Sequence, residues 1–281
     1  MCENLWDTQG VGRLNGLPTL KTEGARLLQI FLKKYLSVKI SKLERYKQIG
    51  EFPNLVEPFV RDLQNTPANL CGKWNSSFFK RDAELVLEMG CGWGDFSVGM
   101  ARNFPERNFL GLDVKGARIW RGAKTSFEEG LKNLGFLRIE GEFVERLFAP
   151  GELSEIWITF PTPYLRKPEK MLVSPTFLSR YRRLLSKNGV LHLKTDVELL
   201  GNYVFNIWPH CGFELLNSKS EYLETFQHPI PEVHTNFEAR AVGLQKRIWH
   251  IKAAPTSGNV ASVPDEVARC PWKKSNTNSN K

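Results

Sequence analysis

The chain has 281 residues, of which 41% are hydrophobic and 25% charged, as is usual for soluble globular proteins. Lysine and arginine outnumber aspartate and glutamate by 39 to 30, and the net charge of +9 fits either a polyanionic partner such as nucleic acid or an ordinary basic enzyme. The five scattered cysteines form no CxxC pair and the five histidines show no metal-ligand spacing, so we expect neither a disulfide framework nor a metal site. The sequence shows no signal peptide and no apolar run of about 20 residues, so we expect a cytoplasmic protein without membrane contact.

Residues 1–84 are predicted to form an N-terminal basic extension, with a helix near Gly24–Ser37 and a loop at Glu51–Pro58. Between Lys21 and Lys47 eight basic residues accompany two acids, with two tyrosines among them. Such a run is typical of a solvated helix face or of a surface that binds phosphates.

Residues 85–252 alternate short apolar runs with helical patterns. The expected strands are Leu85–Met89, Asn108–Val114, Phe136–Glu140, Glu155–Phe160, Gly189–Thr195, Phe213–Asn217 and Arg247–Lys252. The expected helices are Asp95–Asn103, Lys115–Glu129, Pro175–Leu185 and Glu198–Pro209. This alternation predicts an α/β fold with a doubly wound, mostly parallel sheet of seven strands, in which ligands bind at the carboxyl ends of the strands. Residues 253–281 are expected to be a disordered polar tail.

A glycine-rich run, EMGCGWG at Glu88–Gly94, follows the first expected strand directly. Glycines at a strand-to-helix junction allow a tight turn and a close approach of the backbone to a ligand. The second strand ends at Asp113, where a carboxylate is placed to accept hydrogen bonds from ribose hydroxyls.

This layout also describes a dinucleotide site, and it is compatible with a plain glycine-rich turn. The spacing is GxGxG without the third glycine of GxGxxG. Glu88 places a negative charge where S-adenosylmethionine is cationic and where a pyrophosphate would be repelled. The run therefore favours a methyl donor over a dinucleotide, and Cys91 within it is interpreted as a small turn residue and not as a nucleophile.

The acceptor side of the site is expected after the fourth and fifth strands. Residues Thr159–Tyr164 form a rigid Pro-x-Pro turn next to an aromatic side chain, which suits a base displaced from its stack, although Pro-x-Pro also simply ends strands. From Arg166 to Lys187 seven basic residues accompany one acid, as in a surface that follows phosphates. Asp196 leaves the sheet after the fifth strand, where it either accepts from the N–H groups of guanine or caps the next helix.

Five runs in this order, EMGCGWG, GLDV, FPTPYLRK, LHLKTD and TNFEAR, resemble the bacterial tRNA (guanine-N7-)-methyltransferase family over about residues 40–252. The resemblance implies a class I, Rossmann-like methyltransferase fold, S-adenosyl-L-methionine as cofactor and tRNA as partner. It also implies methylation of N7 of the guanine at position 46, in the variable loop. A monomer or a homodimer is expected.

The resemblance also implies roles for individual residues. The cofactor contacts are expected to be Glu88, Gly90, Gly92, Asp113, Glu142 and Phe143. The substrate contacts are expected to be Arg166, Asp196, Thr235, Asn236, Phe237 and Glu238. The residues of the catalytic pocket are expected to be Asp196 and Thr162. Because N7 of guanine has an available lone pair, no general base is required, and catalysis is expected to depend on alignment and on exclusion of water. On this view Asp196 and Glu238 hold the guanine edge, and Arg166 and Lys167 hold phosphates.

The chain departs from the family pattern at three places. Thr162 stands where the family commonly has aspartate, Tyr164 where it has tryptophan, and Glu142–Phe143 where it has Asp-Ala. The change at position 162 leaves open a tRNA-binding protein with weak or lost activity. A methyltransferase for another RNA or protein acceptor and an NAD-dependent enzyme also stay open on the sequence alone.

Overall fold

The computed structural model describes residues 40–64, 67–164, 167–216, 233 and 235–257. All helices and strands given below belong to the compact unit Lys42–Lys281. They build one sheet of eight strands, in the order β1 (Leu55–Val56), β4 (Leu134–Arg138), β3 (Asn108–Asp113), β2 (Leu85–Met89), β5 (Leu153–Thr159), β6 (Leu185–Thr195), β8 (Trp249–Pro255) and β7 (Phe213–Leu215). The expected helix near Gly24–Ser37, Arg166 and residues 258–281 of the expected tail lie outside the described residues. The prediction that the tail begins at residue 253 is wrong, because the last strand of the sheet extends to Pro255.

The first half of the domain is the expected β-α-β-α-β run. Its elements are β2 (Leu85–Met89), α4 (Asp95–Asn103), β3 (Asn108–Asp113), α5 (Gly116–Glu129) and β4 (Leu134–Arg138). The three strands pair in parallel, and every residue of β2 is buried, as expected for a strand covered on both faces. Helix α5 ends at Gly130, whose φ of 68° closes the helix in the left-handed conformation.

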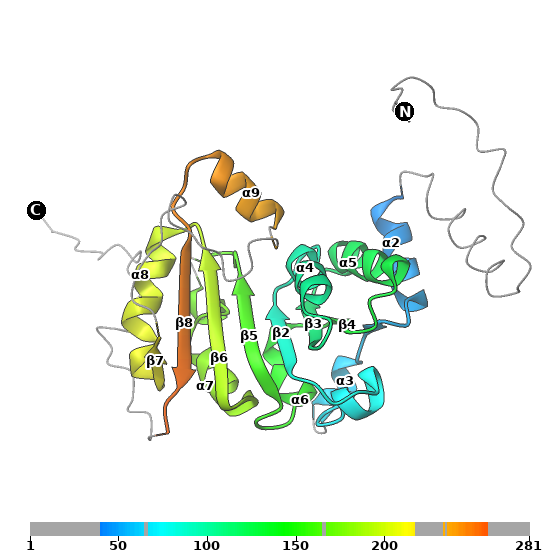
Figure 1. The fold of residues 1–281 in the computed structure, drawn as a ribbon, viewed down its shortest axis with the longest axis horizontal. Helices are drawn as coiled ribbons and strands as arrows, with labels where there is room; N and C mark the ends of the chain where they lie inside the picture. The colour runs from blue at the N-terminus through cyan, green and yellow to red at the C-terminus, as the bar shows by residue number, and fades with distance from the viewer. Residues whose placement is uncertain (1–39, 65–66, 165–166, 217–232, 234, 258–281) are drawn as a thin grey trace, which may run out of the picture. The chain divides into compact units, whose positions relative to one another are not determined.

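The second half continues the sheet on the other side of β2. Its elements are η3 (Gly141–Phe143), α6 (Val144–Leu147), β5 (Leu153–Thr159), η4 (Pro168–Lys170), α7 (Pro175–Leu184), β6 (Leu185–Thr195), α8 (Glu198–Ile207), η5 (Pro209–Cys211), β7 (Phe213–Leu215), α9 (Asn236–Gly243) and β8 (Trp249–Pro255). Strand β8 runs antiparallel between β6 and β7. This insertion brings the segment before β8 to the carboxyl end of β6, so α9 lies over the carboxyl ends of the central strands (Figure 1).

The described residues that precede β2 pack into the same unit. Their elements are α2 (Lys42–Gln48), η1 (Ile49–Glu51), β1 (Leu55–Val56), α3 (Val60–Leu63) and η2 (Trp74–Phe79). Strand β1 pairs in parallel with β4 and adds an eighth strand to the seven that the sequence predicts. The sequence did not predict this strand because its two paired residues are too few to form a recognisable apolar pattern. Trp74 is buried in the core and donates from its indole nitrogen to the Leu147 carbonyl at 2.8 Å.

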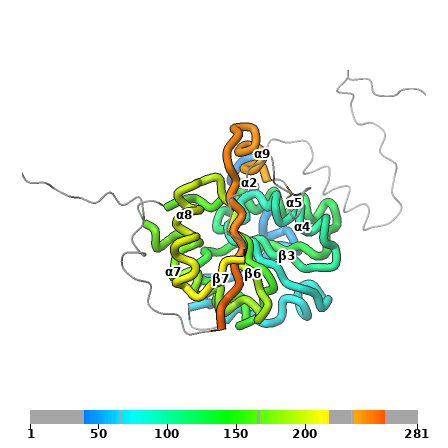
Figure 2. The backbone as a smooth tube through the Cα atoms, turned by 60° about the vertical axis from the view of Figure 1, so that its left-hand side comes forward, coloured from blue at the N-terminus to red at the C-terminus, as the bar shows by residue number. Residues whose placement is uncertain are grey.

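Helices cover both faces of the sheet, as Figures 1 and 2 show. Helices α6, α7 and α8 share one apolar core with the sheet, in which Leu191, Leu193 and Ile251 are fully buried. Helix α4 packs on the opposite face, where Phe96 contacts Trp157 with ring centroids 4.9 Å apart.

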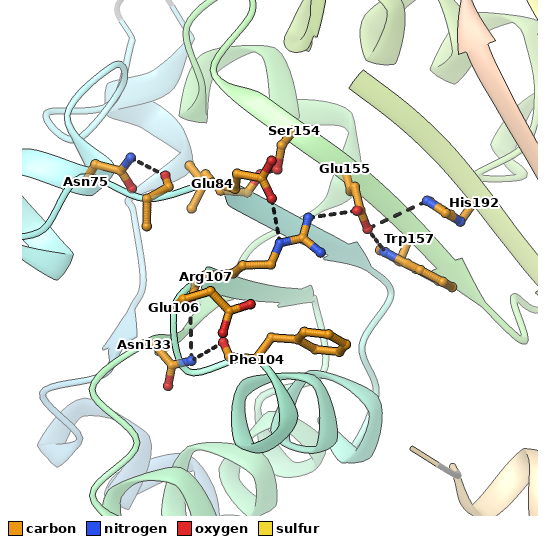
Figure 3. Close-up of polar contacts among 12 residues, drawn as sticks. Asn75, Glu84, Phe104, Glu106, Arg107, Asn133, Ser154, Glu155, Trp157 and His192 are labelled. Carbon is orange, nitrogen blue, oxygen red and sulfur yellow. Dashed lines mark hydrogen bonds and ion pairs between the residues drawn. The ribbon is translucent and has the colours of Figure 1, made fainter. Parts of the chain in front are cut away.

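A polar cluster lies on this second face, toward the amino ends of the strands (Figure 3). Arg107 forms ion pairs with Glu84 at 2.8 Å and with Glu155 at 2.7 Å. Trp157 donates to the same Glu155 at 2.6 Å and stacks on His192, with ring centroids 3.8 Å apart. Burial and the nearby cations hold the pKa of His192 well below its usual value, so this ring is neutral and structural.

Candidate active site at the carboxyl edge of the sheet

The glycine-rich turn follows β2 and is held to the end of β3. The Gly90 and Cys91 amides both donate to the Leu112 carbonyl, at 2.7 and 2.9 Å. Burial raises the pKa of Cys91 well above that of a free thiol, so the thiol stays protonated and fills the turn.

The turn is closed toward the protein and open on its other side. Gly94 has φ 75° at the start of α4, and a Cβ there would lie 2.8 Å from the Phe136 ring and 3.0 Å from the Gly122 Cα. Gly92 has φ 56°, yet a Cβ there would meet no atom within 4 Å. A ligand can therefore approach the backbone at Gly92, while Gly94 provides the close packing of helix on sheet.

Glu88, at the end of β2, is 3% exposed and connects three elements of the site. Its Oε2 accepts from the Ser97 amide at 3.1 Å and from the Ser97 hydroxyl at 2.5 Å, and its Oε1 accepts from the Thr159 hydroxyl at 2.6 Å. Burial raises the pKa of Glu88 to about 7, against the hydrogen bonds from Ser97 and Thr159, which lower it. The charge of this carboxyl therefore responds to a cation placed beside it at neutral pH.

Asp113, at the end of β3, fixes the same turn from the other side. Its Oδ2 accepts from the Gly92 amide at 2.9 Å, and its Oδ1 accepts from the Lys115 amide at 2.8 Å. Each carboxylate oxygen has a second lone pair, so a half-buried Asp113 can also accept from a ribose hydroxyl.

Glu142 and Phe143 lie in η3, after the third neighbouring strand, β4. Glu142 is exposed, and Phe143 is half-buried against the main core. Because β2, β3 and β4 are adjacent and parallel, Glu88, Asp113 and Glu142 all lie at one edge of the sheet. Three carboxyls around an open glycine turn suit a ligand with a cationic sulfur and amine and with ribose hydroxyls, so these residues fit S-adenosylmethionine.

The loop after β5 lies next to this cofactor side. Phe160 has φ 45°, a left-handed conformation that is strained for a residue with a Cβ, and its amide donates to the Lys194 carbonyl at 2.8 Å. Thr162 is exposed, and Tyr164 is 50% exposed at the end of this loop.

Asp196 follows β6 and pairs with a lysine from the segment before β8. Its Oδ2 accepts from Lys246 Nζ at 2.8 Å, and the two side chains are 26% and 48% exposed. The alternative of a helix cap at Asp196 is wrong, because α8 begins after Val197, whose amide donates to the Thr195 hydroxyl at 3.1 Å. Asp196 therefore lies directly after the carboxyl end of β6, with its side chain paired to Lys246.

The Thr235–Glu238 segment starts α9 with a capping bond, since the Thr235 hydroxyl accepts from the Glu238 amide at 3.0 Å. The Glu238 side chain is buried and accepts from Lys194 Nζ at 2.6 Å. Burial lowers the pKa of Lys194, and the Glu238 carboxylate counteracts this shift. A buried ion pair of this kind fixes α9 on the end of β6.

Two further residues of the segment point toward the site. Asn236 donates from its side chain to the Asp95 carboxylate at the start of α4. Phe237 is 61% exposed, and its ring lies 6.4 Å from that of Phe160 at an interplanar angle of 17°. Helix α9 therefore connects the acceptor side of the site to the helix that follows the glycine turn.

The structure also brings in residues to which the sequence analysis assigned no contact in the site, namely Ser97, Thr159, Lys194 and Lys246. For Lys194 the sequence does contain a signal of burial. Leu191 and Leu193 point to one face of strand β6, so Lys194 points to the opposite face, which is also covered. A buried lysine requires an acidic partner. Nothing local marks the other three.

Within the described part of the chain, no group of three or more His, Cys, Asp or Glu residues is placed to hold a metal ion. The same residues include no helix with the length and hydropathy needed to cross a membrane.

Comparison with known proteins places this geometry in a family. A model of a family described as putative methyltransferase matches residues 82–251. The tRNA (guanine-N(7)-)-methyltransferase of Christiangramia forsetii is 39% identical over 216 residues, 75% of this chain and 96% of the relative. That of Bacteroides fragilis is 45% identical over 163 residues, 58% of this chain and 65% of the relative.

Among solved structures, the 16S rRNA methyltransferase KamB superposes with a TM-score of 0.50 at 17% identity, over 64% of this chain and 91% of that one. This likeness concerns the fold alone, which is that of the class I S-adenosylmethionine-dependent methyltransferases. The sequence matches go further, and the chain belongs to the tRNA (guanine-N7-)-methyltransferase family.

Proposed function

We propose that the chain transfers a methyl group from S-adenosylmethionine to N7 of the variable-loop guanine of tRNA. The observation that carries the proposal is that the open glycine turn with its three carboxyls and Asp196 lie at the same edge of the sheet, in a chain related to tRNA (guanine-N7-)-methyltransferases. When bound, the cofactor supplies an electrophilic methyl on a sulfonium, which N7 takes up with its lone pair as the sulfur–carbon bond breaks.

On the cofactor side, the ionised Glu88 attracts the positively charged ligand, and hydrogen bonds from Ser97 and Thr159 hold the Glu88 carboxylate in place. Asp113 accepts from the ribose hydroxyls, and its bond to the Gly92 amide keeps the turn open. Glu142 and Phe143, in η3 after β4, are proposed to complete the cofactor side of the site. These residues bind and orient, and none of them transfers a proton.

On the acceptor side, Asp196 accepts from the N–H groups on the guanine edge, which leaves N7 directed at the methyl group. The buried Glu238 acts through Lys194 by fixing α9, and a direct contact with guanine would require this pair to open. Phe237 and Asn236 are exposed on α9 and are available to the substrate.

The tRNA backbone is proposed to follow the exposed basic residues near this edge, among them Lys167, Lys170 and Arg240. The net charge of +9 supports a polyanionic partner. Binding should then weaken steeply with salt, because each phosphate contact releases counterions. The protein is proposed to act in the cytoplasm, where tRNA is available; its oligomeric state stays a prediction.

The test is transfer of a labelled methyl group from S-adenosylmethionine to unmodified tRNA, followed by strand cleavage specific for N7-methylguanine. Label at the variable-loop guanine is the expected result. Label at another nucleotide of the tRNA would show that the chain is a tRNA methyltransferase with a different acceptor position. No label, with cofactor and tRNA both bound in separate titrations, would favour the second candidate, a tRNA-binding protein without activity, which is motivated by Thr162 in place of the family's aspartate.

A further inference from the structure

The ion pair between Asp196 and Lys246 places a donor and an acceptor side by side on the rim of the site. The Lys246 Nζ atom lies 2.8 Å from Asp196 Oδ2, and both side chains are partly exposed. Guanine presents the complementary order on its Watson–Crick edge, with the O6 acceptor next to the N1–H and N2–H donors. Adenine presents the reverse at the first two positions, a donor next to an acceptor.

We propose that Lys246 is a specificity-determining residue, which donates to guanine O6 while Asp196 accepts from N1–H and N2–H. The inference rests on the proposed function and adds the residue that forms a hydrogen bond with the O6 atom of the base. The pair is neutral as a whole, so it recognises the hydrogen-bonding pattern without adding net charge to the site. A hydrogen-bonding site of this kind rejects a base that leaves its groups unpaired.

The backbone around Lys246 is held in the position from which its side chain reaches Asp196. The Lys246 amide donates to the Ala241 carbonyl at 3.0 Å, which closes the end of α9. The preceding Gln245 has φ 53°, a left-handed conformation that is strained for a residue with a Cβ. Immediately afterwards Trp249 pairs with Thr195 in the antiparallel β6–β8 ladder, which brings Lys246 to the carboxyl end of β6, beside Asp196.

The exposure of the pair allows a base to reach it. A partly exposed ion pair is screened by solvent and contributes little to stability, so opening it to admit the base edge costs little. The base gains a charge-assisted bond to each partner in exchange. Recognition of a displaced base through its Watson–Crick edge is the usual mode in enzymes that act on single nucleotides.

The test combines Lys246→Met with a change of one atom in the substrate. The tRNA carries either guanine or 6-thioguanine at the target position, because sulfur is a weak acceptor and the N1–H and N2–H groups remain. We expect Lys246→Met to lower kcat/KM about tenfold on the guanine tRNA and to cause little further loss on the 6-thioguanine tRNA. Lys246→Arg, which retains a donor and the charge, should preserve most of the activity.

The matched control is Lys132→Met, which removes the same charge from an exposed lysine in the turn before β4, at the amino edge of the sheet. It should leave both tRNAs unaffected. Wild-type kinetics for Lys246→Met on the guanine tRNA would overturn the proposal. An equal loss on both tRNAs would also overturn it, and a smaller salt dependence of binding would then identify Lys246 as a phosphate contact.

Binding of both tRNAs without cofactor is measured for the same variants, which separates this inference from the proposed function. If the wild-type protein methylates no guanine, the proposed function fails. Recognition of O6 is still tested by affinity: the wild-type protein, Lys246→Arg and the control variant should bind the guanine tRNA more tightly than the 6-thioguanine tRNA, and Lys246→Met should bind the two equally.

Discussion

Replacing Glu88 by glutamine is expected to stabilise the free protein at high pH and to weaken its binding of S-adenosylmethionine. The side chain is 3% exposed, and burial raises its pKa from 4.5 to about 7. The folded state thus holds the proton more tightly than the unfolded state, so the stability due to this group falls as the pH rises from 4.5 to 7 and is constant above that. At 1.36 kcal/mol per pKa unit, the loss is about 3 kcal/mol.

Glutamine is isosteric and fits the same partners. Its carbonyl accepts from the Ser97 amide and hydroxyl, and its amide donates to the Thr159 hydroxyl, so no buried polar group loses its bond. The variant should therefore lack the pH-dependent loss. For a domain of this size, 3 kcal/mol corresponds to roughly 6–12 °C in Tm.

The assay is thermal unfolding of the wild type and Glu88→Gln without ligand, at intervals from pH 4.5 to 8, with isothermal titration of S-adenosylmethionine at pH 6 and 8. The difference in Tm should shift in favour of the variant as the pH rises. Affinity of the wild type for the cationic ligand should increase with pH, because binding favours the ionised carboxyl, and the variant should bind at least tenfold more weakly at pH 8. Glu214→Gln, an exposed carboxylate on β7, is the control. A Tm difference that is the same at pH 5 and pH 8 would refute the reasoning.

Three further predictions concern the glycine turn and the acceptor side. Gly94→Ala should lower the free energy of unfolding by about 3 kcal/mol, because φ at this position is 75° and the new Cβ would lie only 2.8 Å from the Phe136 ring. Gly92→Ala should lower it by about 1 kcal/mol, because the new Cβ there meets no atom within 4 Å. Equal losses for the two variants in denaturant unfolding would contradict the packing described. Asp196→Ala should reduce methyl transfer at least tenfold with nearly unchanged cofactor affinity, measured beside the exposed neighbour Glu198→Ala, and unchanged turnover would remove Asp196 from the catalytic pocket. Thr162→Asp should raise kcat several-fold without changing cofactor affinity if the family's acid positions the guanine, and an unchanged kcat would mean that this position has no such role here.

Much of the fold and of the site is determined by local sequence. The seven expected strands and four expected helices are present because apolar runs and 3.6-residue patterns are local signals that burial on a sheet preserves. The glycine run, Asp113 and Asp196 lie at one edge because the carboxyl ends of parallel strands necessarily do so. The family resemblance, which rests on the order of five short runs, is confirmed by the comparisons.

The tertiary structure alone decided which partners these residues have. Glu88 meets Thr159 across 71 positions of sequence, and Lys194 meets Glu238 across 44, and no local pattern encodes contacts at such separations. The order β6-β8-β7 follows from antiparallel insertion of the last strand, which the apolar run of that strand does not specify. That insertion brings Lys246 to Asp196, and it is the reason that the carboxylate predicted to cap a helix or to bind guanine forms an ion pair at the rim of the site.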